Sequence, residues 1–492
     1  HYMNKTFITS ILLFCATQLL MAQNVVESKL QNKMETMADS LTRHLQPWHV
    51  PNNIYSIEKF GAKADGKSIN TKSIQSAIDT CSKNGGGYVV LSKGDYVTGT
   101  IQLQSNVMLK VERGARLLGS TNLKDYPEIV EEMPSVMRNM HHYRLSLIYA
   151  EHANNIGICG EGEIYFRGER ANFPGPETTG SIEGRPFGIR IIQCKNIFMQ
   201  GITLRSSAAW MQNYLACKDI IIDGIKVINT NSNYNCDGLD PDGCKNVIIR
   251  NCYIESHDDA MCLKSASGQA NENILIENCK FYSTCNAFKF GTDTQGDFRN
   301  IYARNLLLGS LTDPSSNFLK RNDCSTGITL ETVDGGNVEN ILIRNVDIRG
   351  SRCPIFIYIG NRGRVWNQEK PKAGYLKNVL IENVTGRDNR IQGSLITGIP
   401  EQALENITLR NVYLQTIGGG KENLRDRKVP LRTPYPDAQD YRRDGLPSYG
   451  FYIRYTKSVN LENVNVISMT EDKRESIICA EGNEDITINK QN

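Results

Sequence analysis

The sequence predicts an all-β protein, a right-handed parallel β-helix with a short N-terminal capping helix. Three observations support this fold class. Segments of similar pattern recur at intervals of 23 to 40 residues, three of which are 27. Each segment holds two short strands separated by a polar break that contains Asn, and no amphipathic helical stretch lies between consecutive segments. Strands that repeat at such a period without crossover helices stack as the coils of a solenoid.

The repeat is clearest in KNVIIRNCYI and ENILIENCKF. Its recurring Asn suits a tight turn that needs left-handed backbone geometry or a side chain bonded to the backbone. The L-x-x-L-x-L pattern of leucine-rich repeats, the rival solenoid, is absent from the sequence. Eight repeats begin at Lys195, Lys218, Lys245, Glu272, Arg299, Glu339, Lys377 and Glu405.

A third strand precedes each repeat. Because every coil contributes one, we expect these strands to lie side by side as one long sheet. The nine segments are RPFGIRIIQC, AWMQNYLAC, CDGLD, DAMCLKS, NAFKFGT, GITLETV, PIFIYIG, SLITGI and YGFYIRY.

The ends of the chain predict a cap, an arm and a signal segment. A helical stretch over about 71–82 would cover the open end of the solenoid, whose bare edge invites aggregation. We interpret residues 1–22 as a tag remnant followed by a secretory signal peptide, 23–50 as a polar, helical N-terminal arm, and 51–492 as a single β-helix catalytic domain. A long loop over about 418–447 is a candidate wall of a groove.

Composition limits the possible functions. The chain has 492 residues with 56 Lys and Arg against 53 Asp and Glu, so bulk charge does not favour nucleic-acid binding. The apolar run near residues 7–21 is too short for a lasting membrane anchor, so we expect a secreted or periplasmic protein, free of the membrane after signal removal. We expect a monomer, although no sequence feature sets the oligomeric state.

The 14 cysteines resemble a disulfide framework only until their positions are considered. Several lie inside apolar runs at recurring places, such as Cys252 and Cys279, so we expect buried free thiols. No C-x-x-C motif and no Cys/His cluster of zinc-site spacing occurs.

Three aspartates are the candidate catalytic residues. Asp237 and the pair Asp258 and Asp259 stand 21 residues apart on neighbouring coils, so we expect them to converge. Like charges so close raise the pKa of at least one carboxyl, which lets one group act as an acid and another as a base. Glycoside hydrolysis needs this division of labour. Asp240 and Asp242 lie near enough to confuse the assignment.

Other interpretations of the same residues stay open. The aspartates in NCDGLDPDG could be turn residues. The cluster could bind calcium, as in parallel β-helix lyases. His257, Asp258 and Asp259 resemble zinc ligands, but no second histidine lies nearby in the sequence, so a surface histidine is the better interpretation.

Over roughly residues 50–470, the sequence resembles glycoside hydrolase family 28, the polygalacturonase or pectin hydrolase family. The resemblance rests on three parts of the sequence. The first, near the start of the solenoid, contains ADG, NT and GGG between residues 64 and 87; the others are GRPFGIRIIQCKNIFMQGITLRSSAAW and the two segments that carry the aspartates. The family's Asn-Thr-Asp motif matches Asn235-Cys236-Asp237, and its Gly-Asp-Asp matches His257-Asp258-Asp259. The implied fold is the pectin lyase-like solenoid. The implied reaction is inverting hydrolysis of a pectic bond without cofactor or metal, with Asp259 as the acid and Asp237 and Asp258 holding and deprotonating the attacking water.

Two family motifs are missing, which makes the chain an atypical member. The Gly-His-Gly motif aligns with Cys285-Asn286-Ala287, so Asn286 replaces the histidine. The Arg-Ile-Lys motif aligns with Thr329-Leu330-Glu331, and Glu331 would repel a uronate. The rhamnogalacturonan branch of the family also departs from the motif at this position, so the loss of the histidine resembles that branch. We therefore expect action on branched or mixed pectic oligosaccharides, from a chain end.

Substrate-binding candidates lie on neighbouring strands. Lys264, Lys289, Arg362 and Arg364 could replace the missing cations, although solvated charges at strand ends are an alternative. Several aromatic and polar side chains near the sheet could contact sugar rings, or they could have only a structural role. They are Trp210, Gln212, Tyr449, Tyr452 and Tyr455. Arg185 is either a strand anchor or part of a subsite.

Three functions are consistent with the sequence. The favoured one is an inverting pectic glycoside hydrolase that acts on galacturonic acid-containing or rhamnogalacturonan-containing chains. The second is a calcium-dependent pectic lyase, which would release an unsaturated product. The third is a non-catalytic carbohydrate-binding β-helix.

Overall fold

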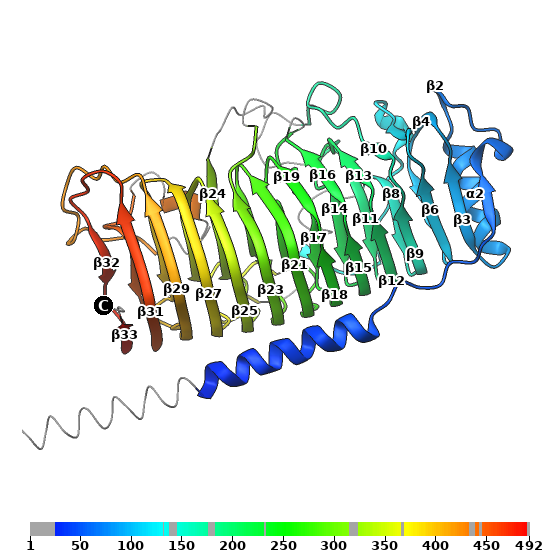
Figure 1. Ribbon diagram of the computed structural model, residues 1–492. Helices are drawn as coiled ribbons and strands as arrows, with labels where there is room; N and C mark the ends of the chain where they lie inside the picture. Colours follow the sequence, from blue (N-terminus) through cyan, green and yellow to red (C-terminus); the bar gives the residue numbers. More distant parts are fainter. Residues whose placement is uncertain are drawn as a thin grey trace, which may run out of the picture.

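The computed structural model describes residues 25–130, 132–136, 145–175, 183–230, 233–313, 323–365, 369–431, 438–441 and 445–489. The chain winds as a parallel β-helix along nearly its whole length (Figure 1). Every registered strand pair between coils is parallel, so the predicted fold class is confirmed. The predicted signal segment, residues 1–22, lies outside the described residues. No helix in the described ranges is long and apolar enough to cross a membrane.

One face of the solenoid is a 12-stranded sheet to which all nine predicted third strands contribute. The strand order follows the coils, so neighbours in this sheet are about 4.8 Å apart. Its strands are β5 (Ile101–Gln102), β8 (Ser146–Glu151), β11 (Phe187–Ile192), β14 (Gln212–Leu215), β17 (Asp240–Asp242), β20 (Met261–Ser265), β22 (Asn286–Thr294), β24 (Cys324–Thr332), β26 (Ser351–Ile359), β28 (Ser394–Thr397), β30 (Ser448–Arg454) and β32 (Glu475–Cys479).

The repeat motifs form the remaining faces. Those of the first coils are β1 (Ile54–Ser56), β2 (Asp65–Ile69), β3 (Gly87–Leu91), β4 (Gly94–Thr98), β6 (Val107–Val111), β7 (Ala115–Gly119), β9 (Asn154–Cys159) and β10 (Glu163–Tyr165). The later coils contribute β12 (Lys195–Gln200), β13 (Thr203–Arg205), β15 (Lys218–Asp223), β16 (Lys226–Asn229), β18 (Lys245–Arg250), β19 (Tyr253–Ser256), β21 (Asn271–Ser283), β23 (Phe298–Gly309), β25 (Val338–Arg349), β27 (Leu376–Asn389), β29 (Glu405–Thr416), β31 (Ser458–Ser468) and β33 (Asp485–Asn489).

The recurring asparagines form ladders along the turns. Asn273 has a φ of 57° and donates its side-chain amide to Asn246 at 3.3 Å, while Asn300 donates to Asn273 at 3.1 Å. Asn305 and Asn345 belong to a second ladder, linked at 3.1 Å. The predicted left-handed geometry is confirmed, and the side chains bond to one another from coil to coil. This pairing fixes the register of successive coils.

The interior is a continuous column of aliphatic side chains with buried thiols. The 13 cysteines in the described part of the chain are all free, and ten of them are buried. The prediction of buried thiols in place of a disulfide framework is confirmed. Cys252 and Cys279, at equivalent places on successive coils, each donate to the carbonyl two residues before them.

The capping helix is α2 (Thr71–Lys83), within one residue of its predicted end. It buries Ile74, Ala77, Ile78 and Cys81 in the first coils, so it closes the apolar column at that end. The short 3-10 helices are η1 (Ile57–Phe60), η2 (Leu123–Asp125) and η4 (Ala438–Tyr441).

A helix over residues 25–44 lies along the outside of the solenoid (Figure 1). Its apolar stripe packs on one outward-facing residue from each of five successive coils, and Glu35 pairs with Arg344 at 2.7 Å. The packed side chains are Leu30, Met34, Ala38 and Leu41 against Ile248, Leu275, Tyr302, Leu342 and Leu380. The helix therefore braces the coils from β18 to β27.

Candidate active site

The outward face of the 12-stranded sheet changes character along the solenoid. In the column that runs in register from β8 to β30, the side chains are charged or polar in the central strands and aromatic or aliphatic from β26 onward. The column is Tyr149, Arg190, Asn213, Asp240, Cys262, Lys289, Thr329, Phe356, Leu395 and Tyr452. Its central part is the candidate active site.

The segment between β7 and β8 covers the first strands of this face. Ile129 and Met133 pack over Tyr149, Ile192 and Leu215. Further along, Val136 packs with Phe187, Trp210 and Ala266, and its N–H donates to the carbonyl of Ala266 at 2.9 Å. The outer face is therefore closed as far as β14, and at the edge where the strands end the cover extends to Ala266, just after β20 (Met261–Ser265).

The loop between β29 and β30, predicted as a groove wall, covers the other end. Its described residues pack onto the apolar part of the outer face as one buried cluster, which contains Val429, Ala438, Tyr441 and Leu446 from the loop and Phe356, Tyr358, Leu395, Tyr452 and Ile478 from the sheet. Only β17, β20, β22 and β24 lie between the two covered stretches. Five strand steps separate β14 from β26, or about 24 Å at 4.8 Å each.

The three predicted aspartates lie in this central stretch, in turns that stack on one another. Asp237 precedes β17, and Asp258 and Asp259 precede β20. The N–H of Gly238 donates to the carbonyl of Asp259 at 2.8 Å, which joins the two turns. Asp237 and Asp259 are each only 3% exposed, whereas Asp258 is half-buried. Carboxyl oxygens of Asp258 and Asp259 lie within 4.8 Å of each other.

The pKa values of these carboxyls diverge. Burial and the charges of Asp258 and Asp259 together raise the pKa of Asp237 to about 8, against the opposing effect of Lys264. Burial and the adjacent Asp259 raise the pKa of Asp258. Burial also acts to raise the pKa of Asp259, but Lys289, Lys264 and a bond from Asn286 outweigh it and lower the pKa. In the free protein these shifts therefore favour the ionised form at Asp259 more than at Asp237 or Asp258.

Asp240 adds a fourth carboxyl that the sequence left ambiguous. It is fully buried, and burial together with the charge of Asp237 raises its pKa well above the ordinary value. Lys264 lies between the two carboxyls, 3.0 Å from Asp237 and 3.8 Å from Asp240. The strand register could have revealed Asp240, because it faces outward next to Cys262.

Lys264 and Lys289 point into the carboxylate cluster. Lys264 also lies 4.4 Å from the ring centroid of Trp210, a cation–π contact. Lys289 is 3.3 Å from Asp259 and 3.9 Å from Glu331. Each lysine is therefore shared between two carboxyls, and Glu331 is paired within the site.

Asn286 occupies the predicted place beside the aspartates. Its amide donates to Asp259 at 2.6 Å, while its oxygen accepts from the hydroxyl of Thr326 at 2.7 Å. Thr329 in turn donates to Thr326 at 2.6 Å. This role of the two threonines was not predicted from the sequence, although alignment of successive third strands places Thr326 directly beside Asn286.

Arg185 anchors the turn that carries Asp237. Its guanidinium donates to the side-chain oxygen of Asn235 at 2.9 Å and to the carbonyl of Tyr234. Asn235 has a φ of 54°, which suits the turn. Of the two interpretations of Arg185, these contacts support the structural anchor. They also hold Asn235 in the turn that carries Asp237.

Of two further predicted substrate-binding residues, Tyr452 lies apart from the carboxylates and Arg362 lies near Glu331. Tyr452 is on β30, five strand steps from β20, and is packed under the loop. Arg362 follows β26 and is bound by Asp334, with 2.9 Å between its Nε and the carboxylate. The loop covers Tyr452, whereas Arg362 reaches back to Thr292 and Asp293 at the end of β22.

The donor set of a possible metal site mixes hard and soft groups. Asp258, Asp259 and the thiol of Cys285 lie within 4.8 Å of one another. Calcium takes oxygen ligands, and a thiol is not one of them. Asp259 is also engaged by Lys289 and Asn286, so these residues do not fit a calcium site.

Comparison with known proteins agrees with this arrangement. The family model of glycosyl hydrolases family 28 matches residues 81–431. A probable polygalacturonase from Vitis vinifera is 26% identical over 389 residues, which is 75% of each chain. An exo-poly-alpha-D-galacturonosidase from Dickeya chrysanthemi is 23% identical over 74% of this chain and 67% of its own.

A solved structure shares the fold. The hyperthermoactive exopolygalacturonase from Thermotoga maritima superposes with a TM-score of 0.65 at 18% identity, over 89% of this chain and 97% of that one. The family match spans both aspartate turns and the strands between the two covered stretches. The chain therefore belongs to glycosyl hydrolase family 28 and is a glycosidase.

Proposed function

We propose that the protein is an inverting glycoside hydrolase that removes sugars from one end of pectic chains containing galacturonic acid or rhamnogalacturonan. One observation carries the proposal: three aspartates with divergent pKa values lie in a short polar stretch whose two ends are covered by packed loops. A glycosidase needs both a proton donor and an ionised base at the bond it cleaves.

Action at a chain end follows from the covered ends. About 24 Å of outer face accommodates a few sugars, and a polymer running through it would collide with the loop residues over β8–β14 or β26–β30. Proteins similar to this chain include an exo-poly-alpha-D-galacturonosidase and an exopolygalacturonase, which supports the same substrate class and mode of attack.

We assign the roles by electrostatics. Asp259, whose pKa is lowered, takes a proton from the attacking water. Asp258, whose pKa is raised and which is half-buried, donates a proton to the leaving oxygen as the glycosidic bond breaks. Asp237 and Lys264 hold the water or the sugar hydroxyls between them. Attack by water opposite the leaving group would invert the anomeric carbon.

The pairing of cations with carboxyls in the site favours a substrate chain that contains neutral sugars as well as uronates. Lys264 and Lys289 are each shared between two carboxyls, and Arg362 is bound by Asp334. A site without a row of unpaired cations grips consecutive uronates less well than one that has them. This supports a neutral sugar, such as the rhamnose of rhamnogalacturonan, on one side of the cleaved bond.

The proposal is tested with defined pectic oligosaccharides. Products would be separated by chromatography, and the first anomer released would be identified by proton NMR. We expect a single short product per cut, with inverted configuration. Oxygens of Asp258 and Asp259 lie within 4.8 Å of each other, whereas the carboxyls of typical inverting pairs are roughly 6.5–9.5 Å apart. This short distance taken alone favours retention, so the configuration of the released anomer decides between inversion and retention. An unsaturated product would indicate a lyase, and a retained anomer would refute inversion.

The acid and base are distinguished by leaving-group dependence. Asp258→Asn should lose about 10²–10⁴-fold activity on natural substrates but recover on an aryl glycoside whose leaving group needs no proton. Asp259→Asn should be impaired on both. The reverse pattern would restore the acid role to Asp259.

We also propose that the protein acts outside the cytoplasm. The order of charged, apolar and small residues over 3–23 supports export. Fractionation of cells that express the full chain, with sequencing of the mature N-terminus, tests it. Retention of the uncleaved chain in the cytoplasm would contradict the proposal.

A further inference from the structure

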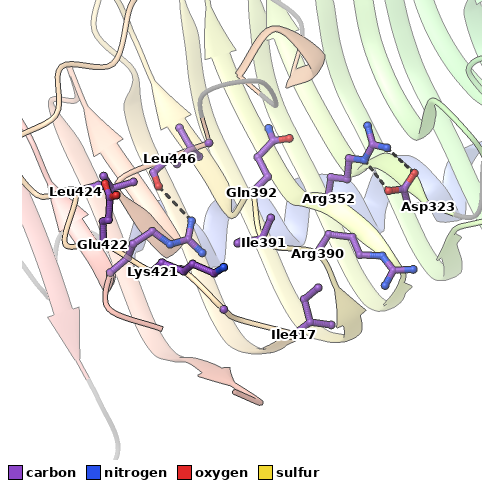
Figure 2. Close-up of a pocket in the computed structure, with 14 residues that line it drawn as sticks. Asp323, Arg352, Arg390, Ile391, Gln392, Ile417, Lys421, Glu422, Leu424 and Leu446 are labelled. Carbon is purple, nitrogen blue, oxygen red and sulfur yellow. Dashed lines mark hydrogen bonds and ion pairs between the residues drawn. The ribbon is translucent and has the colours of Figure 1, made fainter. Parts of the chain in front are cut away.

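A cavity of about 700 Å³ lies beside the covered end of the sheet (Figure 2). It is bounded by the start of β26, by residues 390–392 between β27 and β28, by both ends of the loop between β29 and β30, and by Arg474 before β32. None of the three aspartates lines it. It is therefore separate from the candidate active site.

The cavity wall carries cations that differ in how they are neutralised. Arg352 is held by Asp323 through two bonds of 2.7 and 2.8 Å, and Arg474 is held by Asp472 in the same way. Arg390 and Lys421 form no ion pair within 4 Å among the described residues. In the view of Figure 2, Lys421 lies on one side of Ile391 and the two arginines, Arg352 and Arg390, lie on the other. Glu422 also lines the cavity, so Arg390 and Lys421 leave the wall with a net positive charge after Glu422 is counted.

Apolar side chains complete the cavity. Ile391 is 45% exposed and Ile417 is 39% exposed, and both line the cavity. An apolar surface flanked by cations suits a ligand with a carboxylate and a hydrophobic face. A uronic-acid residue has both, in its carboxylate and the C–H groups of its ring.

The position of the cavity links it to the active site. Asp323 at its edge is followed by Cys324, whose thiol donates to the carbonyl of Cys285 at 3.2 Å, and Cys285 precedes Asn286. The near edge of the cavity is thus about two strand steps, or about 10 Å, from the turn of Asp259 along the same edge of the sheet. A chain that leaves the active site cannot continue over β26, but it can cross this edge.

We propose that the cavity is an accessory subsite that binds a uronate of the pectic chain through Arg390 and Lys421, away from the bond that is cleaved. This inference rests on the proposed function for its substrate class. The subsite holds long chains near an active site that itself accommodates only a few sugars. It adds affinity for polymers without adding affinity for the shortest substrates.

The test compares an Arg390→Ala, Lys421→Ala double variant with wild type. The apparent KM for a long uronate-containing chain should rise about five- to tenfold, while kcat/KM for the shortest cleaved oligosaccharide stays unchanged. Lys280→Ala and Lys226→Ala, combined, remove two exposed cations on another face and serve as the matched control. Equal KM values for the double variant and this control would overturn the inference.

Binding measured without turnover separates this inference from the proposed function. Titration calorimetry with oligogalacturonate in the Asp259→Asn background should show weaker binding after the two changes, and neutral galactan should show no difference. If no hydrolysis is found but this loss occurs, the proposed function fails and the subsite stands. If hydrolysis is found and both KM and binding are unchanged, the subsite fails. Arg390→Gln alone replaces the double variant if the latter unfolds.

Discussion

At the residue scale, the site is a cluster in which carboxyls outnumber lysines. Asp237, Asp240 and Asp259 surround Lys264, and Glu331 shares Lys289 with Asp259. Burial makes ionisation of all the acids unfavourable, so protons are retained in the cluster at neutral pH. Protons held in this way are available for transfer to a leaving group.

The hydroxyl of Thr326 is predicted to position Asn286. Thr326→Val removes the bond that orients the Asn286 amide, so its N–H group no longer points reliably at Asp259. We expect kcat to fall about tenfold with little change in KM, and the pKa of the base to rise because a bond to its ionised form is weakened. The pH profile of kcat measures this shift.

Thr326→Ser keeps the hydroxyl and is the matched control. It should restore both kcat and the acidic limb of the pH profile. If Thr326→Val alters thermal stability but leaves the pH profile unchanged, the role of Thr326 is structural only.

The pH dependence of stability should reflect Asp242. This fully buried carboxyl accepts the N–H of Ala266 at 2.8 Å, and burial raises its pKa to about 7. The unfolded chain has a pKa of about 3.9 at such a group, so the folded state binds the proton more tightly. The resulting stability is fully present below about pH 4 and is lost as pH rises toward 7.

Asp242→Asn should therefore flatten the fall of Tm between about pH 5 and pH 8. Calorimetry at several pH values measures this slope, with the exposed Asp388→Asn as the control. A parallel slope in Asp242→Asn and wild type would show that Asp242 does not titrate in this range.

At the element scale, the N-terminal helix over 25–44 is predicted to stabilise the coils it crosses. Met34 is fully buried against them, so Met34→Ala should lower the free energy of unfolding by about 2–5 kcal/mol. Lys33→Ala changes an exposed neighbour and should have little effect. Denaturant unfolding followed by fluorescence measures both, and equal stabilities would contradict the bracing role.

The sequence predicted the strands far better than the packing of the loop and the helix. Period and alternation locate a strand such as β20, and the 22-residue interval brings Asp237 beside Asp259. The hydrogen bond from Tyr302 to Glu35 at 2.8 Å joins residues far apart in the chain, which local pattern does not encode. A usable signal did exist for the loop: PIFIYIG is apolar on both faces, as expected of a strand covered on both sides, whereas CDGLD is not.

Tyr452, predicted as a sugar-binding candidate and buried under the loop, shows where that signal stops. An outward-facing aromatic residue on the sheet can contact a sugar or a covering loop, and the two alternatives have the same strand pattern. The choice depends on Val429 and Tyr441, which reach the sheet from a loop whose path has no periodic pattern.

At the scale of the whole molecule, the solenoid provides one long surface of which only a short part remains for chemistry. The covered stretches over β8–β14 and β26–β30 restrict the substrate to the strands between them. Loops that cover both ends of this surface favour attack at chain ends over cleavage within chains, and the coils themselves need not change. The accessory subsite would then lie on the path of a chain that extends beyond the covered end.

The most direct test measures viscosity and reducing ends together during digestion of polygalacturonate and rhamnogalacturonan. Attack at chain ends predicts that reducing ends accumulate on at least one polymer while viscosity stays nearly constant, with Asp259→Asn as the inactive control. A steep loss of viscosity while few reducing ends have formed would show cleavage within chains and contradict the account.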